Sequence, residues 1–232
     1  MYARIALLAA CAALPGCVVE RTGPTEHVTR TIERGEAKSL RVNLRMGAGE
    51  LRVTGGSSEL AEADCTYNVP SWRPEISYSA SETRGLLTIE QTGKHHGHVG
   101  NMRYEWNLRL NDEVPVEVHA EFGAGHARLN LGSLFLRSVD VNMGVGELEM
   151  DLRGNPKHDY EVRVQGGVGE ATVRLPANVG VTARGTGGIG SINVRGLRKE
   201  GGRWVNDAID SSKVQVRVDV SGGIGQINLI AE

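Results

Sequence analysis

Six positions in the sequence share one setting and carry polar side chains that could bind a cation or exchange a proton. Each position directly follows a Gly-x-Gly unit. In chain order the six residues are Glu50, His126, Glu147, Glu170, Ser191 and Gln226. If the units stack in register, neighbouring side chains lie about 4.8 Å apart along one edge. Glu147 and Glu170 could then hold Ca²⁺ or share a proton. The interpretation we favour is a solvated edge whose charges discourage lateral aggregation.

A second group contains three of the seven histidines, His95, His96 and His98, in the run KHHGH. Imidazoles at this density can bind Zn²⁺, Cu²⁺ or Ni²⁺. Glycines at 93, 97 and 100 surround the run, so we interpret it as an exposed hairpin tip with adventitious metal affinity. A dedicated metal site at these histidines is the alternative.

Two tryptophans stand beside arginines in loop-like sequence, Trp72 in PSWRP and Trp204 in GGRWVND. An exposed indole beside a guanidinium can stack on a glycan or on a protein partner. The favoured interpretation is that both rings cover an end or a side of the folded domain. Trp106 lies in the alternating run YEWNLRL and is expected in the core.

No arrangement typical of a hydrolase or a nucleotide-binding enzyme occurs in the sequence. It lacks Gly-x-Ser-x-Gly, His-Glu-x-x-His and a P-loop, and no glycine unit opens a helix as a dinucleotide fingerprint would. We therefore predict no catalytic residue and no cofactor. The alternative is a carbohydrate-active enzyme that uses Glu147 and Glu170 as its two carboxylates.

Glycine spacing defines the elements that must position these groups. Of 232 residues 31 are Gly, about twice the usual share. Twelve of them form the six Gly-x-Gly units, whose first glycines are separated by 76, 21, 23, 21 and 35 residues. The paired glycines are Gly47, Gly49, Gly123, Gly125, Gly144, Gly146, Gly167, Gly169, Gly188, Gly190, Gly223 and Gly225. Repeats of this length are typical of solenoids or arrays.

Apolar residues alternate on both sides of each unit, which predicts strands. The residue between the glycines keeps the alternation of the preceding strand, whereas the following strand is shifted by one residue, as from Val145 to Leu148. Such a shift is what a sharp corner needs if both arms are to face one core. We predict an all-β fold, a β-solenoid or β-helix-like stack with about six corners and two strands per repeat. A β-sandwich is the runner-up.

The N-terminal segment has the features of a targeting signal. Residues 1–17, MYARIALLAACAALPGC, contain one basic residue and an apolar run of ten, too short to cross a bilayer and typical of a secretory signal. The ending Leu-Pro-Gly-Cys resembles the lipobox of bacterial lipoproteins, which implies a signal peptide over 1–16 and a lipid on Cys17. We expect residues 17–37 to be the lipidated Cys and a flexible tether, and 38–232 to be the folded domain. Cys65 is then the remaining thiol besides Cys17 and is expected to be buried.

Four runs carry a resemblance to a known family. They are MGAGELRVTGG (46–56), CTYNVPSWRPEISY (65–78), YEWNLRLNDEVPVEV (104–118) and GGVGEATVRLP (166–176). Over roughly residues 37–232 the chain resembles the toast-rack family of bacterial envelope proteins. That family is similar to adhesin-like domains of unknown function and to the C-terminal domain of Lia-type cell-wall stress regulators. The resemblance implies an all-β, rack-like stack and brings no catalytic residues.

Together these features predict a non-enzymatic, lipid-anchored envelope protein with a rigid β-repeat surface for binding or scaffolding, in adhesion or in cell-wall stress sensing. The expected partners are the membrane through the N-terminal lipid, and an envelope protein or glycan. A net charge of −2 gives no footprint for nucleic acid. The final repeat runs almost to Glu232 without a cap, so we expect this C-terminal edge to dock on a second copy or another chain. If the source organism has an outer membrane, Val18, the residue after Cys17, predicts that the protein is anchored there.

Overall fold

The computed structural model describes residues 19–93, 97–99 and 101–232, and it is built from strands. Six long strands of 15 to 17 residues contain the Gly-x-Gly units: β3 (Ser39–Thr54), β9 (Val116–Asn130), β10 (Leu136–Asp151), β11 (Tyr160–Leu175), β12 (Gly180–Arg195) and β15 (Gln215–Ala231). We call each of them a rung. The all-β stack predicted from the sequence is confirmed. Each repeat is one continuous bent strand, where the sequence predicts two.

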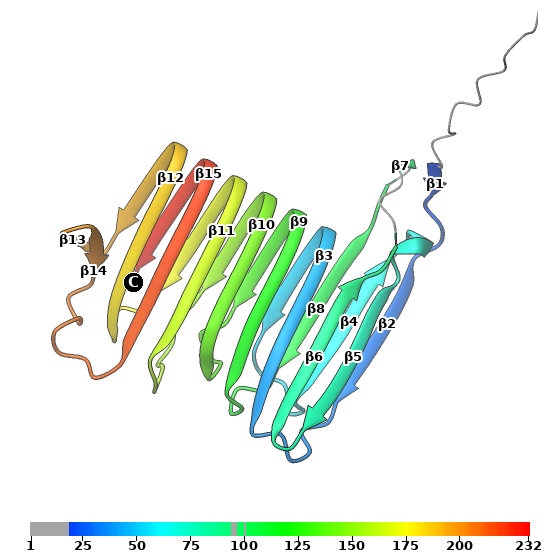
Figure 1. Ribbon diagram of the computed structural model, residues 1–232, viewed down its shortest axis with the longest axis horizontal. Coiled ribbons are helices and arrows are strands. Elements are labelled where there is room, and N and C mark those ends of the chain that lie inside the picture. Colours follow the sequence, from blue (N-terminus) through cyan, green and yellow to red (C-terminus); the bar gives the residue numbers. More distant parts are fainter. Residues whose placement is uncertain (1–18, 94–96, 100) are drawn as a thin grey trace, which may run out of the picture.

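The rungs pair in parallel in the order β12-β15-β11-β10-β9-β3. The pairing is in register, so that Gly146 of β10 lies beside Gly125 of β9 and Gly169 of β11. Figure 1 shows the six rungs folded over in the same way, with their bends aligned along one border of the molecule. The final strand, β15, lies between β11 and β12. The prediction that the last repeat forms the open edge is therefore wrong, and β12 is the terminal rung instead.

The core lies between the two arms of the folded rungs. In β10 the arm before the bend buries Val139, Val141 and Met143, and the arm after it buries Leu148 and Met150. Alternate residues of both arms face outward, so one bent strand supplies two facing layers. Full burial of each aliphatic side chain contributes about 1.5–3 kcal/mol to stability. The stack therefore resembles a narrow sandwich whose two sheets are joined at the bends.

The glycines stand where the backbone turns from one arm to the other. The second glycine of each unit has a positive φ, for example +140° at Gly146. A Cβ at Gly146 would lie 1.9 Å from the carbonyl oxygen of Gly125 on the neighbouring rung. A side chain at this position would therefore clash with the backbone of the adjacent rung, and the positive φ would be strained for any residue other than glycine. The residue between the glycines is turned outward: Val145 is 54% exposed, although the alternation of the preceding strand would place it inside.

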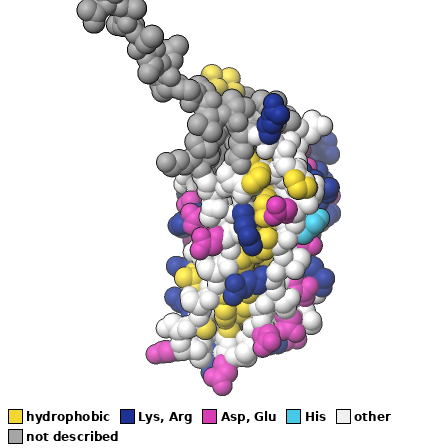
Figure 2. Space-filling view, turned by 90° about the vertical axis from the view of Figure 1, so that its right-hand side faces the viewer, with side chains coloured by type: hydrophobic (Ala, Val, Ile, Leu, Met, Phe, Trp, Pro, Cys, Tyr) yellow, Lys and Arg dark blue, Asp and Glu magenta, His cyan; other side chains and the backbone are white. Residues whose placement is uncertain are grey.

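At the N-terminal end the two layers are built from separate strands. The first arm of β3 pairs with β6 (Arg84–Gln91), which pairs with β5 (Pro74–Ser81). The second arm pairs with β8 (Tyr104–Leu110), followed by β4 (Ala61–Tyr67) and β2 (Glu26–Ile32). Figure 2 views this end and shows a strip of hydrophobic side chains between borders of charged ones. Arg30 of β2 donates to the carbonyl of Ile76 in β5 (3.0 Å) and links the two layers.

Part of the expected tether is ordered. Residues 26–32 form β2, which is paired along its whole length with β4. The sequence gives a weak signal here because β2 is an edge strand whose residues are mostly exposed, with Ile32 as its one buried side chain. The sheet therefore begins earlier than residue 38. The short strands β1 (Val19–Arg21) and β7 (Gly97–Val99) form a separate parallel pair.

The aromatic residues close the ends of the stack. Trp72, in the 3₁₀ turn Pro70–Trp72, is buried and packs edge-on against Tyr104 at 5.5 Å, and Tyr104 lies 5.6 Å from the buried Trp106. At the opposite end β13 (Arg198–Glu200) and β14 (Arg203–Val205) form a hairpin that pairs with β12 and places Trp204 over it. Over the described residues, no helix has the length and apolar character needed to cross a membrane.

Candidate functional site

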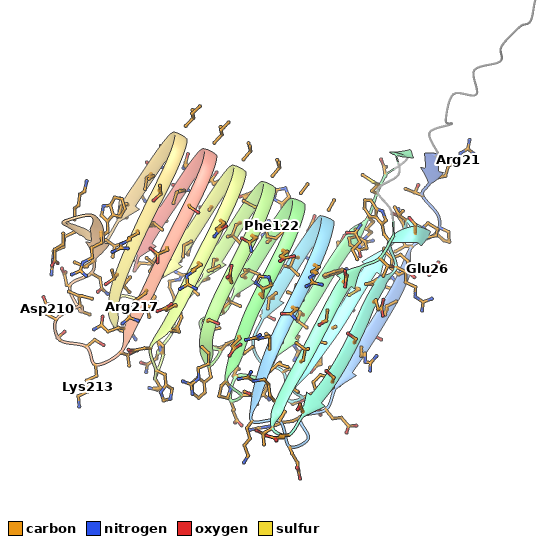
Figure 3. All side chains as sticks on the ribbon, in the orientation of Figure 1. Arg21, Glu26, Phe122, Asp210, Lys213 and Arg217 are labelled. Carbon is orange, nitrogen blue, oxygen red and sulfur yellow. The ribbon has the colours of Figure 1, made fainter. Side chains whose placement is uncertain are left out.

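The bends of the six rungs form a continuous outer edge, which is the candidate site. Its outermost row consists of the residues between the paired glycines, one from each rung; we call this row the apolar ridge. From β3 to β12 in spatial order it consists of Ala48, Ala124, Val145, Val168, Ile224 and Ile189. The four larger side chains are between 44% and 71% exposed. Figure 3 shows a row of side chains that stand clear of the ribbon above the bends.

On one side of the ridge lies the polar ladder that the sequence singled out. Its spatial order is Glu50, His126, Glu147, Glu170, Gln226 and Ser191. Neighbouring rungs satisfy its charges: Nδ1 of His126 lies 3.0 Å from Oε2 of Glu147, and Asn228 donates to Oε1 of Glu170 at 2.7 Å. Arg52 pairs with Glu50 on the same rung at 3.0 Å.

The ladder is a partly exposed edge on which Glu50, His126, Glu147 and Glu170 each have a side-chain partner, in agreement with the solvated edge of the favoured interpretation. Glu147 and Glu170 do lie on adjacent rungs, but each is engaged by a different neighbour. Within the part of the chain that the structure describes, no group of three or more His, Cys, Asp or Glu side chains is placed to hold a metal ion. The geometry therefore gives no support to a cation site on this edge.

On the other side of the ridge an open groove of about 640 Å³ crosses β3, β9, β10 and β11. Its outward side chains, one per rung, are Arg45, Glu121, Asn142 and Gln165, and Glu90 and Gln91 of β6 close one end. We call it the shoulder groove. Arg45 lies 3.7 Å from Glu121 and 3.8 Å from Glu90. Within the described residues the side-chain amides of Asn142 and Gln165 make no hydrogen bond, so both are available to a ligand.

The inside of the bend differs between the two halves of the stack. The last inward position before the bend holds Met46, Phe122 and Met143 in β3, β9 and β10. It holds Gly166, Gly222 and Gly187 in β11, β15 and β12. A cavity of about 100 Å³ lies beneath the bends of these three rungs. Its lining includes Met143, Ala171 and Ile227, so it is largely apolar.

The other residues named by the sequence fall in several places. Trp72 is buried and Trp204 is half-buried against β12, which agrees with the favoured interpretation that both rings cover the folded domain; stacking of Trp72 on a glycan, the alternative, is excluded by its burial. Cys65 is buried, and burial raises the pKa of its thiol to about 12, which suits a core residue. Cys17, His95 and His96 lie outside the described residues, and for His98 the structure describes the backbone within β7.

The sequence analysis missed the apolar ridge. The signal was present, because the residue between the glycines is Ala, Val or Ile in all six units. Alternation assigns that residue to the core, and only the folded path of the backbone shows that a bend turns it outward. The available clue was that this residue is apolar in every unit, although a residue at a bend does not have to point into the core.

Comparisons with known proteins concern the chain as a whole. The family model for the N-terminal domain of toast_rack, DUF2154, matches residues 21–174. The crystal structure of a candidate cell adhesion protein from Clostridium sporogenes is 33% identical, with a TM-score of 0.87, over 90% of this chain and 100% of that one. A candidate adhesin from Parabacteroides distasonis is 11% identical over 93% of this chain and 100% of that one, with a TM-score of 0.30. No curated protein matches the chain. Neither the family model nor the Clostridium sporogenes structure names an enzymatic activity.

Proposed function

The chain belongs to the toast-rack family, and from this membership we propose that it is a non-enzymatic, lipid-anchored protein of the bacterial cell envelope with an adhesion-like binding role. Its 33% identity to a candidate cell adhesion protein over nearly the whole chain supports the adhesion-like part of the proposal. The N-terminal sequence ending in Leu-Pro-Gly-Cys supports anchoring through Cys17. The envelope location follows from both.

The shoulder groove is the observation that carries the binding role. It presents one polar side chain per rung across four rungs, at a repeat of about 4.8 Å. The amides of this row can both donate and accept hydrogen bonds, whereas the guanidinium donates only and the carboxylate accepts only. A ladder with a regular repeat suits a partner that is itself extended and polar, such as an envelope glycan or a protein segment. In-register pairing on both sides fixes the backbone of these rungs, so the surface is pre-formed and little ordering entropy opposes binding.

The anchoring part is tested by metabolic labelling with an alkyne-bearing fatty acid, followed by membrane fractionation. We expect the full chain to be labelled and to sediment with membranes. The variant Cys17→Ser should be unlabelled and should sediment with membranes to a smaller extent than the parent, whereas Cys65→Ser should behave as the parent. Equal labelling of Cys17→Ser and the parent would contradict lipidation at this residue.

The binding part is tested with the purified domain, residues 19–232, and two probes, isolated peptidoglycan and delipidated envelope protein. We expect the double substitution Asn142→Ala with Gln165→Ala to weaken binding to one of these probes. The matched control removes two amides from the opposite layer, Asn193→Ala with Asn228→Ala, where the two side chains bond to each other at 3.0 Å. Equal loss in both variants, or no binding to either probe, would contradict recognition through the shoulder groove.

A further inference from the structure

Exposed apolar side chains of this protein are concentrated on one border. Six large hydrophobic side chains are exposed in the described part of the chain, and Val145, Val168, Ile189 and Ile224 of the apolar ridge are four of them. A fifth, Met102, is 54% exposed and lines the same hollow as Ala48 and Ala124 at the other end of the ridge. Scattered single residues of this kind are ordinary, but a continuous row of them marks an interaction surface.

The row is graded along the stack. Side chains grow from alanine on β3 and β9 to valine on β10 and β11 and to isoleucine on β15 and β12. Its shoulders change as well. Beside the alanines stand charged residues such as Arg45, Glu121 and Glu50, whereas Ser221, Gln226 and Ser191 flank the isoleucines. The far end of the ridge, on β15 and β12, is therefore its most apolar part, with the fewest charges to desolvate.

The N-terminal segment is attached on the same border, at the opposite end. Gly23 donates its backbone N–H to the carbonyl of Asn68 at 2.7 Å, which fixes the chain six residues after Cys17. Asn68 directly precedes the turn that carries Trp72, and Trp72 lines the hollow shared with Ala48 and Ala124. In Figures 1 and 3, β1 with Arg21 and the bends of β12 and β15 lie along the same upper border.

We propose that the far end of the apolar ridge, Ile189 and Ile224, rests in the surface of the lipid bilayer and gives the anchored protein a second membrane contact. This inference rests on the proposed lipid anchor at Cys17. An anchor at one end leaves the stack free to swing about that point. A second contact at the other end holds the long axis of the stack parallel to the membrane. The two outer faces of the stack, including the shoulder groove, then face along the membrane plane instead of toward the lipid.

The shape of the ridge fits a bilayer. It is a convex single file about 24 Å long, five intervals of roughly 4.8 Å, and a convex line has no pocket into which a second identical ridge can interlock. A deformable acyl boundary accepts such a line to a depth of about 5–10 Å without requiring a complementary surface. The gradient also fits, because the residues nearest the anchor are already held close to the membrane and need the least affinity of their own.

The test uses the full, lipidated chain in vesicles of phosphatidylethanolamine and phosphatidylglycerol. An environment-sensitive fluorophore is attached to Ile189→Cys and, separately, to Lys213→Cys. Lys213 is exposed at the same end of the stack but on the opposite border (Figure 3). Cys65 is buried, and the unsubstituted chain measures any background labelling. We expect quenching by lipid-borne nitroxide at residue 189 and quenching by aqueous iodide at residue 213.

Each outcome decides the matter. Iodide quenching at both positions in sedimented vesicles would overturn the ridge contact while leaving the lipid anchor intact. Shielding at residue 189 accompanied by disulfide cross-linking between Ile189→Cys copies would assign the ridge to a second copy and would overturn it too. A chain that stays in the soluble fraction would overturn both the anchor and the ridge contact.

A second measurement separates the ridge from the anchor. The unlipidated variant Cys17→Ser is sedimented with the same vesicles, with and without Ile189→Ser and Ile224→Ser. Both substituted side chains are outside the core, so the melting temperature should be unchanged. We expect the two serines to reduce the sedimented fraction several-fold, with Val145→Ser having a smaller effect. An unchanged fraction in the double variant would overturn the proposal.

Discussion

The three N-terminal rungs and the three C-terminal rungs share one backbone path but fill the inside of the bend in opposite ways. β3, β9 and β10 place Met46, Phe122 and Met143 at the last inward position before the bend, and β11, β15 and β12 place glycine there. A Cβ at Gly166 would meet its nearest atoms at 3.7 Å, an ordinary contact. These glycines are therefore not imposed by the backbone, unlike the second glycine of each unit.

In two of the three C-terminal rungs, a large side chain on the arm after the bend lies opposite the glycine on the arm before it. Ile227 faces Gly222 and Ile192 faces Gly187, with side-chain carbons 3.5 and 3.8 Å from the built Cβ positions. β9 shows the reverse pairing, a large Phe122 before the bend and a small Ala127 after it. Only β11 has small residues on both sides, Gly166 and Ala171, and both line the cavity of about 100 Å³ that lies beneath the bends of β11, β15 and β12. At the two positions that flank the bend, β11 therefore has less side-chain volume than any other rung.

The comparison predicts that two glycines 20 residues apart respond oppositely to the same change. Gly146→Ala should lower the free energy of unfolding by about 4 kcal/mol or more, because the new Cβ meets the Gly125 carbonyl oxygen 1.9 Å away at a φ of +140°. Gly166→Ala should be neutral or stabilising by about 0.5–1 kcal/mol, since it restricts the unfolded chain without a clash. Urea unfolding of both variants checks the pair. A similar loss in the two would contradict the division into required and dispensable glycines.

The filled half should be sensitive to truncation. Met143→Ala should cost about 2–4 kcal/mol, because it removes a buried side chain next to the existing cavity and enlarges that cavity. The exposed Met102 provides the matched control: Met102→Ala should change stability by less than about 0.5 kcal/mol. Thermal unfolding followed by circular dichroism measures both. A loss below about 1 kcal/mol for Met143→Ala would show that the bend collapses to fill the space.

The open half should gain from filling. Ala171→Ile copies the side chain that β15 and β12 already carry at this position, and it should stabilise the protein by about 1 kcal/mol. Ala127→Ile makes the same change in β9, where Phe122 already occupies the space, and it should destabilise by about 1–3 kcal/mol. Urea midpoints of the two variants test the signs. Two losses of equal size would show that Ala171 does not border space that a larger side chain can fill.

Much of this architecture can be read from the sequence because it depends on local patterns. Alternation and glycine spacing predict the six bends, the two arms and a core such as that formed by Val139 and Leu148. The order of the rungs is not local: β15 enters between β11 and β12, and no pattern within residues 215–231 distinguishes that place from the edge. The outward turn of Val145 is missed for a similar reason, since alternation describes a straight strand and the ridge exists only at the bend.

A final and smaller effect concerns the contact that joins the two halves at the ends of the second arms. Arg153, just after β10, lies within hydrogen-bond distance of Asp151 (2.6 Å) and of Glu232 (2.7 Å), which follows β15. The hydrogen bond from Arg153 holds the pKa of Asp151 below its ordinary value. The lowered pKa means that this stabilisation is complete above about pH 4 and is lost as the pH falls through the folded-state pKa. Because water screens the pair, its contribution to stability is small. Asp151→Asn should therefore lose less stability than the parent between pH 5 and pH 3, measured by urea unfolding. Parallel losses in the two proteins would show that the Asp151–Arg153 pair does not contribute to the acid sensitivity of the fold.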